Sequence, residues 1–390
     1  MDSSHKTTFV QDILNSIEKG VFHRALRTVV VRGATATVDG RHVIHLCSND
    51  YLGLSQNKHV INKTVEALYE VSQCSSRLIA GNHPKVIELE GLLADHRKTE
   101  SALVYPTGYS ANLGVVTTIA DKKSTIFSDE LNHASIVDAC RLSGAKIVIF
   151  RHNDTDHLEQ LMRQIQGRKI VVTEGIFSMD GDMGKISEIH AIANNHDAIT
   201  VIDDAHGDFI VGPCFSGVPA KLGIDVDIHV SSLSKGLGCF GGYVATTRSI
   251  RELLINKSRQ FIYTSALPDH LCSAAIAALP IAKNGKLQKR LQWNTAYFSS
   301  AMKELGFELA NTASQIIPII VGQERTAVEF SKELLKERVF AQAIRYPTVR
   351  KGHARIRISI TAMHQRKHLE HAAGAFEKAA RRAGILQGYF

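Results

Sequence analysis

Short apolar runs alternate with helix-like stretches between Ser124 and Thr247, and this pattern constrains the fold more than any other feature of the chain. Six runs, most of them rich in Val and Ile, predict strands at residues 124–127, 145–150, 169–173, 198–202, 227–230 and 242–246. Helical patterns lie between several of them, at 133–142, 155–166 and 186–195. Most of the runs are too continuously apolar to have a solvated face. Strand, helix and strand in succession therefore predict an α/β fold with a mostly parallel sheet covered by helices on both faces.

The remainder of the chain predicts a second, smaller domain. Residues 84–98 read as a helix with a proline in its first turn. Long helical patterns then follow Pro268, at 268–282, 287–305, 325–337 and 368–380, with predicted strands at 316–321 and 355–360. A chain of 390 residues is long enough for more than one core. We therefore expect an N-terminal segment (1–45), a large domain (46–283) and a small C-terminal α+β domain (284–390).

The composition argues against several classes of protein. Hydrophobic residues make up 44% and charged residues 22%, as in globular domains, and no apolar run is long enough to cross a bilayer. The N-terminus lacks the apolar core of a secretory signal, and the six cysteines are scattered without a C-x-x-C pair. The net charge of +8 is spread along the chain instead of forming a basic stripe with aromatics. We therefore expect a cytoplasmic protein that binds neither nucleic acid nor membrane.

Polar residues follow three of the predicted strands, at the edge where parallel sheets bind ligands. Ser178 lies in the segment after 169–173, and Asp203 and His206 follow 198–202. Ser232 and Lys235 follow 227–230. The carboxyl ends of parallel strands lie at one edge of a sheet, so we expect these hydroxyl, carboxylate, imidazole and amine groups to converge.

These groups match the chemical needs of pyridoxal 5′-phosphate (PLP). Its pyridine nitrogen needs a carboxylate partner, its aldehyde needs a lysine amine, and its phosphate needs backbone N–H groups with a hydroxyl. Asp203 would supply the first and Lys235 the second. Ser232, together with a turn at Gly108 and Tyr109, would supply the third.

Taken alone, each residue has an ordinary alternative. Lys235 would be a surface lysine and Ser178 a turn serine. Asp203 would be a helix N-cap and His206 a buried structural histidine. The stretch H-N-D-T-D-H at 152–157 carries residue types that bind metals, but it precedes a helical pattern, where Asp or Thr is usually a cap. We therefore expect no metal site.

Six stretches of the sequence carry a family resemblance. They are S-N-D-Y-L-G-L (48–54), P-T-G-Y-S-A-N (106–112), N-H-A-S (132–135), T-E-G-I-F-S-M-D-G-D (173–182), D-D-A-H-G (203–207) and S-L-S-K (232–235). In these stretches, and over nearly its whole length, the chain resembles the α-oxoamine synthases, which are fold-type I PLP enzymes. The resemblance implies PLP as cofactor and an acyltransferase that condenses an L-amino acid with an acyl-CoA and releases carbon dioxide. One departure is H-G-D-F at 206–209, where the family usually has H-G-x-G.

The resemblance implies roles around the cofactor ring. Lys235 would hold PLP as a Schiff base and then move the α-proton, and Asp203 would pair with the pyridine nitrogen. His206 and Ser178 would address the phenolic oxygen of the ring, and His133 would stack on its face.

It also implies how the phosphate is held. Gly108, Tyr109 and Ser232 would bind it, together with Thr264 from a second subunit. We therefore expect a homodimer with its site at the subunit interface.

Four further residues are implied to bind substrates. Asn49 and Arg357 would orient the amino acid, and a guanidinium suits a carboxylate because it can donate two parallel hydrogen bonds. Arg345 and Arg27 would meet a substrate carboxylate or the acyl-CoA.

Three segments favour one subgroup, namely A-I-R-Y-P-T-V (343–349), A-R-I-R (354–357) and F-I-Y-T-S (261–265). They resemble the members that condense L-alanine with a pimeloyl thioester, carried on CoA or a carrier protein, in biotin biosynthesis. The related alternatives are 2-amino-3-ketobutyrate CoA ligases, which use glycine and acetyl-CoA, and serine palmitoyltransferases. A PLP aminotransferase is another alternative. A non-catalytic PLP-fold partner subunit would be marked by loss of the lysine, and Lys235 is present.

Overall fold

The computed structural model describes residues 7–17, 21 and 23–386, and these form two compact units. The large unit comprises Asn49–Gln292 and Thr361–Met363. The small unit comprises the described residues of Met1–Ser48, Trp293–Ile360 and His364–Phe390. The N-terminal residues thus cluster with the C-terminal ones.

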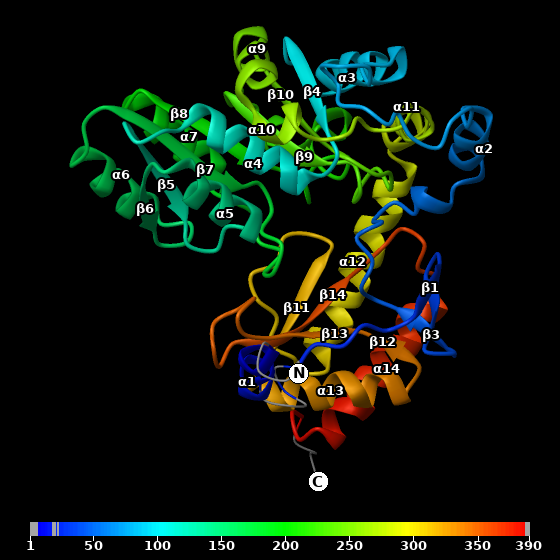
Figure 1. The fold of residues 1–390 in the computed structure, drawn as a ribbon. Helices are drawn as coiled ribbons and strands as arrows, with labels where there is room; N and C mark the ends of the chain where they lie inside the picture. Colours follow the sequence, from blue (N-terminus) through cyan, green and yellow to red (C-terminus); the bar gives the residue numbers. More distant parts are fainter. Residues whose placement is uncertain (1–6, 18–20, 22, 387–390) are drawn as a thin grey trace, which may run out of the picture. The chain divides into compact units, whose positions relative to one another are not determined.

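The large unit is built on a seven-stranded sheet with the order β4-β10-β9-β8-β7-β5-β6 (Figure 1). Its strands are β4 (Ser101–Tyr105), β5 (Ser124–Asp129), β6 (Lys146–Phe150), β7 (Arg168–Glu174), β8 (Ala198–Asp203), β9 (Ile228–Ser232) and β10 (Gly242–Thr246). The run from β9 to β6 is parallel, whereas β10 pairs antiparallel with both β9 and β4. The prediction of a mostly parallel sheet is confirmed, and β4 is a strand that the sequence analysis did not predict.

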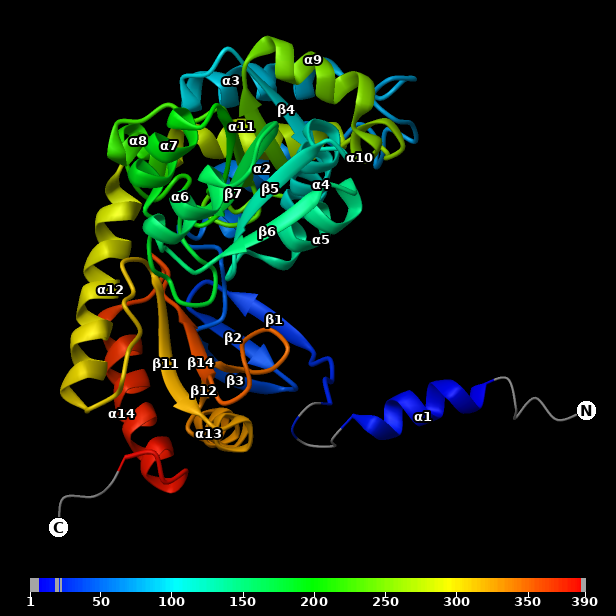
Figure 2. The same ribbon diagram turned by 90° about the vertical axis from the view of Figure 1, so that its left-hand side faces the viewer.

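Helices cover both faces of this sheet (Figure 2). The α-helices that lie wholly in this unit are α2 (Lys58–Glu66), α3 (Pro84–Arg97), α4 (Gly108–Ile119), α5 (Ala134–Ser143), α6 (Thr155–Arg163), α7 (Ile186–Asn195), α8 (Gly217–Leu222), α9 (Arg248–Lys257), α10 (Arg259–Ile262) and α11 (Asp269–Ala282). The sheet has one apolar core on each face, and neighbouring residues of β7 belong to different cores. This is because successive side chains of a strand point to opposite faces. Ile170 packs with Val115 and Ile136 of α4 and α5, whereas Val171 packs with Leu158 of α6. This two-sided burial explains why the central strands β5 and β7 to β9 are continuously apolar, whereas β6 at the edge is largely exposed.

The small unit contains two sheets. One has the order β1-β2-β3-β12, and the other has the antiparallel order β11-β14-β13. The strands are β1 (Val29–Arg32), β2 (Thr35–Val38), β3 (Arg41–His45), β11 (Ile316–Gly322), β12 (Val339–Phe340), β13 (Gln342–Ile344) and β14 (Ala354–Ser359). The helices α1 (Thr8–Ser16), α13 (Glu324–Lys336) and α14 (Arg366–Arg382) belong to this unit, and α12 (Lys286–Glu304) begins in the large unit and continues in the small one. The prediction of a C-terminal α+β region is confirmed.

Within residues 7–17, 21 and 23–386, no helix has both the length and the apolar character needed to cross a membrane.

Candidate active site

The functional side chains of the large unit gather at the carboxyl ends of β7, β8 and β9. In the register of the sheet, Glu174 at the end of β7 pairs with Asp203 at the end of β8. Asp203 pairs in turn with Val230 of β9, two residues before Ser232. Parallel strands that are neighbours in the sheet therefore place these chain segments side by side, as the sequence predicts.

Lys235 lies in the turn after β9, close to the turn after β8. Its Nζ is 3.0 Å from Nε2 of His206. The other ring nitrogen of His206, Nδ1, is 2.7 Å from the hydroxyl oxygen of Tyr51. That hydroxyl donates to Oδ1 of Asn49 at 3.2 Å, so Nδ1 carries the proton and Nε2 is left as an acceptor facing the lysine.

Asp203 is buried and held by two N–H donors. Nδ2 of Asn112 donates to its Oδ2 at 2.6 Å, and the backbone N–H of Ala205 donates to its Oδ1 at 3.0 Å. Asn112 also donates to Oγ of Ser135, which fixes the orientation of the amide. The two hydrogen bonds to Asp203 fix the orientation of its carboxylate. Asp203 is therefore suited to pairing with a cationic N–H, as a protonated pyridine nitrogen requires.

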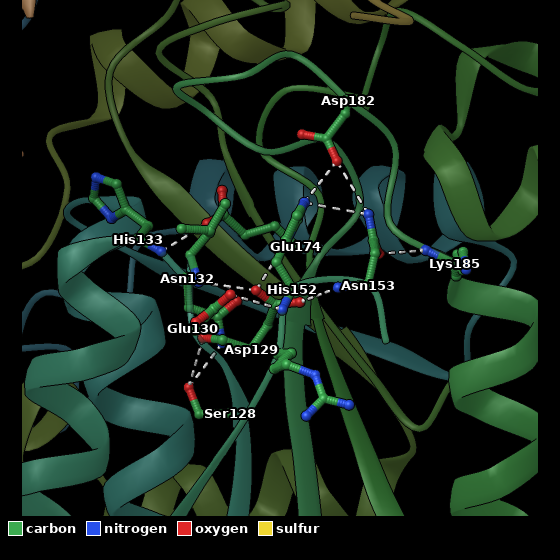
Figure 3. Close-up of polar contacts among 12 residues, drawn as sticks. Ser128, Asp129, Glu130, Asn132, His133, His152, Asn153, Glu174, Asp182 and Lys185 are labelled. Carbon is green, nitrogen blue, oxygen red and sulfur yellow. Dashed lines mark hydrogen bonds and ion pairs between the residues drawn. The ribbon is translucent and has the colours of Figure 1, made fainter. Parts of the chain in front are cut away.

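His133 and Glu174 form the side of the site nearest β5 and β7 (Figure 3). The backbone N–H of His133 donates to Oε1 of Glu174 at 2.6 Å, and Nδ1 of His133 lies 2.8 Å from Oγ of Ser135. Burial lowers the pKa of His133, which favours the neutral ring suited to stacking. Burial, followed by the charge of Asp203, raises the pKa of Glu174.

An anion cradle lies at the start of α4. Thr107 caps this helix through a reciprocal pair of hydrogen bonds with Ser110, and Gly108 and Tyr109 form its first turn. A Cβ on Gly108 would stand only 3.2 Å from Cβ of Ser232, so the absence of a side chain permits this close approach. Oγ of Ser232 is 2.7 Å from Oγ of Ser234. A helix N-terminus beside hydroxyl groups is suited to a phosphate.

Ser178 is buried in the turn between β7 and α7, next to Phe177. The turn is closed by the N–H of Gly181, which donates to the carbonyl of Phe177 at 2.9 Å. Gly181 adopts a left-handed φ of 70°, a conformation that glycine reaches without strain. The side chains of this unit thus offer a carboxylate, an amine and a phosphate cradle, and this set fits PLP.

The predicted substrate arginines belong to the small unit. Arg27 forms an ion pair with Asp39 at 2.8 Å. Nη2 of Arg345 donates to the carbonyl of His23 at 3.0 Å. Arg357 is buried on β14, and its Nη1 donates to Oγ of Ser359 at 2.8 Å.

Thr264, the predicted phosphate ligand from a second subunit, lies after α10 in the large unit. It lines a small pocket together with Arg77, Tyr105 and Phe261. Its role, and the roles of the three arginines, stay predictions.

The unusual H-G-D-F segment is explained by a buried network behind the site. Phe209 is fully buried and stacks on His96 with ring centroids 4.6 Å apart. Asp208 accepts from Nε2 of His96 at 2.9 Å and from Oγ of Ser231 at 2.8 Å. Burial raises the pKa of Asp208, but the charge of Arg97 and the hydrogen bond from His96 outweigh this and hold it below its usual range. Asp208 therefore anchors the His206 turn against β9.

Sequence reasoning gave no role to Tyr51, Asn112, Ser135 or Glu174. All four lie inside the stretches that carry the family resemblance. Tyr51, Asn112 and Ser135 hold other side chains, and Glu174 holds the backbone N–H of His133. Most of these contacts join residues that are distant in the sequence. The signal that could have found them is their place in those stretches.

Comparisons with known proteins show the family to which the chain is related. Residues 41–376 match the family described as Aminotransferase class I and II. The chain is 38% identical to an 8-amino-7-oxononanoate synthase of Thermoanaerobacter pseudethanolicus, with 99% of this chain and 100% of that protein covered. It is 39% identical to the 8-amino-7-oxononanoate synthase of Pelobacter propionicus, with 97% and 99% covered.

Solved structures of PLP enzymes also resemble this chain over nearly its whole length. A serine palmitoyltransferase of Sphingomonas wittichii superposes with a TM-score of 0.92 at 30% identity, covering 99% of this chain and 100% of that one. A high-resolution structure of SPT with PLP superposes with a TM-score of 0.90 at 28% identity, again with 99% and 100% covered. The fold-type I prediction and the prediction of PLP as cofactor are confirmed. Because the family match spans most of the chain and its relatives align from end to end, this chain belongs to the aminotransferase class I and II family of PLP-dependent enzymes.

Proposed function

We propose that the chain condenses L-alanine with pimeloyl-CoA, or with pimeloyl carrier protein, to give 8-amino-7-oxononanoate, the free thiol carrier and carbon dioxide in biotin biosynthesis. The observation that carries the proposal is the convergence of Lys235, His206 and Asp203 at the ends of β8 and β9. The full-length similarity to proteins named 8-amino-7-oxononanoate synthase supports this choice of substrates. A reducing cytoplasmic location is part of the proposal, supported by six free thiols.

Bound PLP supplies an electron sink for the electron pair left at Cα when its proton or its carboxylate departs. Lys235 would hold the cofactor through its aldehyde, and the amine of Lys235 would act as the general base that removes the Cα proton of the substrate. The same amine returns a proton to Cα after carbon dioxide has left. His206, 3.0 Å away, orients Lys235 and accepts a hydrogen bond from its ammonium form.

Asp203 and His133 prepare the environment of the ring. The Asp203 carboxylate, fixed by Asn112, keeps a proton on the pyridine nitrogen. The neutral ring of His133 packs against one face, and Glu174 fixes the backbone of His133 at 2.6 Å.

The substrate-binding residues complete the proposal. Asn49 and Arg357 orient the amino acid, and Arg27 and Arg345 meet the acyl donor. For Arg345, binding of the acyl donor is supported by its buried Nε, which has no acceptor among the described residues. Thr264 reaches the phosphate of a second subunit in a homodimer. Sedimentation of an active monomer would overturn the dimer.

A second candidate is a serine palmitoyltransferase-like reaction, favoured by the TM-score of 0.92 to such an enzyme. Both reactions use the same lysine, aspartate and histidines, so the site geometry alone fits either. The two reactions differ in the acyl donor and in the side chain of the amino acid, so an assay of these substrates distinguishes them.

The test is thiol release by the PLP-loaded protein. L-Alanine, glycine and L-serine are each combined with pimeloyl-CoA, acetyl-CoA and palmitoyl-CoA, and the alanine and pimeloyl-CoA pair is repeated with pimeloyl carrier protein. Release only with alanine and a pimeloyl donor supports the proposal. Release only with serine and palmitoyl-CoA, or with glycine and acetyl-CoA, replaces it by the corresponding relative. Keto-acid formation without thiol release points to an aminotransferase.

A further inference from the structure

The ends of β5, β6 and β7 bring an imidazole between two carboxylates (Figure 3). His152 follows β6, Asp129 ends β5, and Asp182 lies in the turn after β7. Nδ1 of His152 is 2.9 Å from Oδ1 of Asp129, and Nε2 is 2.8 Å from Oδ2 of Asp182. Because both ring nitrogens face carboxylate oxygens, both donate, and the ring is an imidazolium.

The surroundings of His152 maintain this charge. The side chain of Asp129 is fully buried, whereas that of His152 is 21% exposed. Burial lowers the pKa of His152, but the hydrogen bonds and charges of Asp129 and Asp182 outweigh it and raise the pKa to about 10. Glu130 adds to the negative surroundings, since its Oε1 accepts the backbone N–H of His152 at 3.1 Å.

One carboxylate partner shapes the turn that leads to His133. Oδ1 of Asp129 accepts the N–H of Leu131 at 2.9 Å. Asn132 is then fixed by its Nδ2, which donates to the carbonyl of Val172 at 2.8 Å. His133 is the next residue and caps α5. The Asp129 carboxylate therefore helps to set the position of the turn and, with it, the position of His133.

The other carboxylate partner closes the turn that carries Ser178. The carbonyl of Asp182 accepts the N–H of Phe177 at 3.0 Å, and the Oδ2 of Asp182 accepts Nδ2 of Asn153 at 3.0 Å. The ring of His152 also meets the ring of Phe177 edge-on, with centroids 4.4 Å apart. The turn that holds Ser178 is thus fastened to His152 by an ion pair and by an aromatic contact.

We propose that His152 is a positioning residue of the cofactor site, which holds the His133 turn and the Ser178 turn together through Asp129 and Asp182. The inference deepens the proposed function and rests on it for the roles of His133 and Ser178 beside the ring. An uncharged residue at 152 would leave two carboxylates facing each other without a cation, and the two turns would separate. We therefore interpret the stretch at 152–157, which contains metal-ligating residue types, as a segment that holds two turns of the cofactor site together. Its Asp154 caps α6 by accepting the N–H of His157.

The experiment compares His152→Gln with His190→Gln as a matched control. His190 is also partly buried and also has two polar partners, Thr200 and Asn194, but neither is a carboxylate or belongs to a cofactor turn. PLP is titrated into each apoprotein, and the dissociation constant and the visible circular dichroism of the bound cofactor are measured. We expect His152→Gln to weaken PLP binding by about tenfold or more, the size of a lost charged hydrogen bond. We also expect a smaller dichroism band at saturating PLP, whereas His190→Gln keeps both properties.

A purely structural role would lower the melting temperature of the apoprotein and leave the dichroism at saturation unchanged, and this result would overturn the proposal. If His152→Gln does not fold, Asp182→Asn serves as the milder variant and should weaken PLP binding in the same direction. PLP affinity equal to that of the wild type in the folded variants would also overturn it. This experiment uses no substrate, so its result does not depend on the proposed reaction. If the wild-type protein binds PLP but releases no thiol with any substrate pair, the proposed function is contradicted, and the role of His152 can still be tested.

Discussion

The Nζ of Lys235 lies 3.0 Å from Nε2 of His206, although the two residues belong to turns that follow different strands. The contact exists because β8 and β9 are parallel neighbours, so their carboxyl ends present both turns at one edge. It joins the general base of the proposed reaction to an imidazole whose other nitrogen is held by Tyr51.

Lys235→Ala should reduce turnover by about 10³-fold or more, because it removes both the covalent anchor of the cofactor and the general base. Sodium borohydride should no longer fix PLP to the protein, as measured by mass spectrometry of the cofactor-bearing peptide. Lys257→Ala, on the exposed end of α9, is the control and should keep both properties. Activity near the wild-type level in Lys235→Ala would disprove the assignment of this lysine.

Tyr51→Phe should lower kcat by about tenfold, because His206 loses the hydroxyl that fixes its Nδ1 proton. The matched control is Tyr105→Phe, which removes a hydroxyl that is equally buried but bonds Ser258 at 3.1 Å. Steady-state kinetics and the pH profile of kcat are compared in the two variants. Equal effects in both would mean that the Tyr51 hydroxyl contributes only to stability.

Gly108→Ala should weaken PLP binding by about tenfold, because the new Cβ would crowd Ser232 at 3.2 Å and push the phosphate cradle open. Gly91→Ala in α3 is the control, since a Cβ there meets nothing within 4 Å. That control should raise the free energy of unfolding by about 0.5–1 kcal/mol, because alanine favours the helix. Spectroscopic PLP titration and urea unfolding measure the two effects, and unchanged PLP affinity in Gly108→Ala would argue against the cradle.

Acid should destabilise the large unit partly through His229 on β9. Burial lowers the pKa of His229 to about 3, so the folded state resists a proton that the unfolded chain accepts near its ordinary value of 6.5. This contribution is complete above pH 6.5 and is lost as the pH falls from 6.5 towards 3, at about 1.4 kcal/mol per pH unit. Urea unfolding at pH 7, 6 and 5 should show a steeper loss for the wild type than for His229→Gln. Parallel curves would contradict the prediction.

The strands β5 to β10, the helices between several of them and the polar residues at the strand ends could be predicted from the sequence. The runs that became β5 and β7 to β10 are apolar because both faces of the sheet are buried there, and this burial leaves a readable pattern, whereas β6 at the edge is largely exposed. Antiparallel β4 was missed, although it lies beside β10.

By itself the sequence determined the α/β fold and the family, and it gave the residues proposed to act on the cofactor, because the pattern of burial and the chemistry of each side chain are local properties. Only the tertiary structure showed that Tyr51 holds His206 across 155 positions and that Asn112 holds Asp203 across 91. It alone placed His152 between Asp129 and Asp182. Such contacts depend on which strands become neighbours, and strand order is set by the packing of the whole sheet and leaves no mark on a single segment.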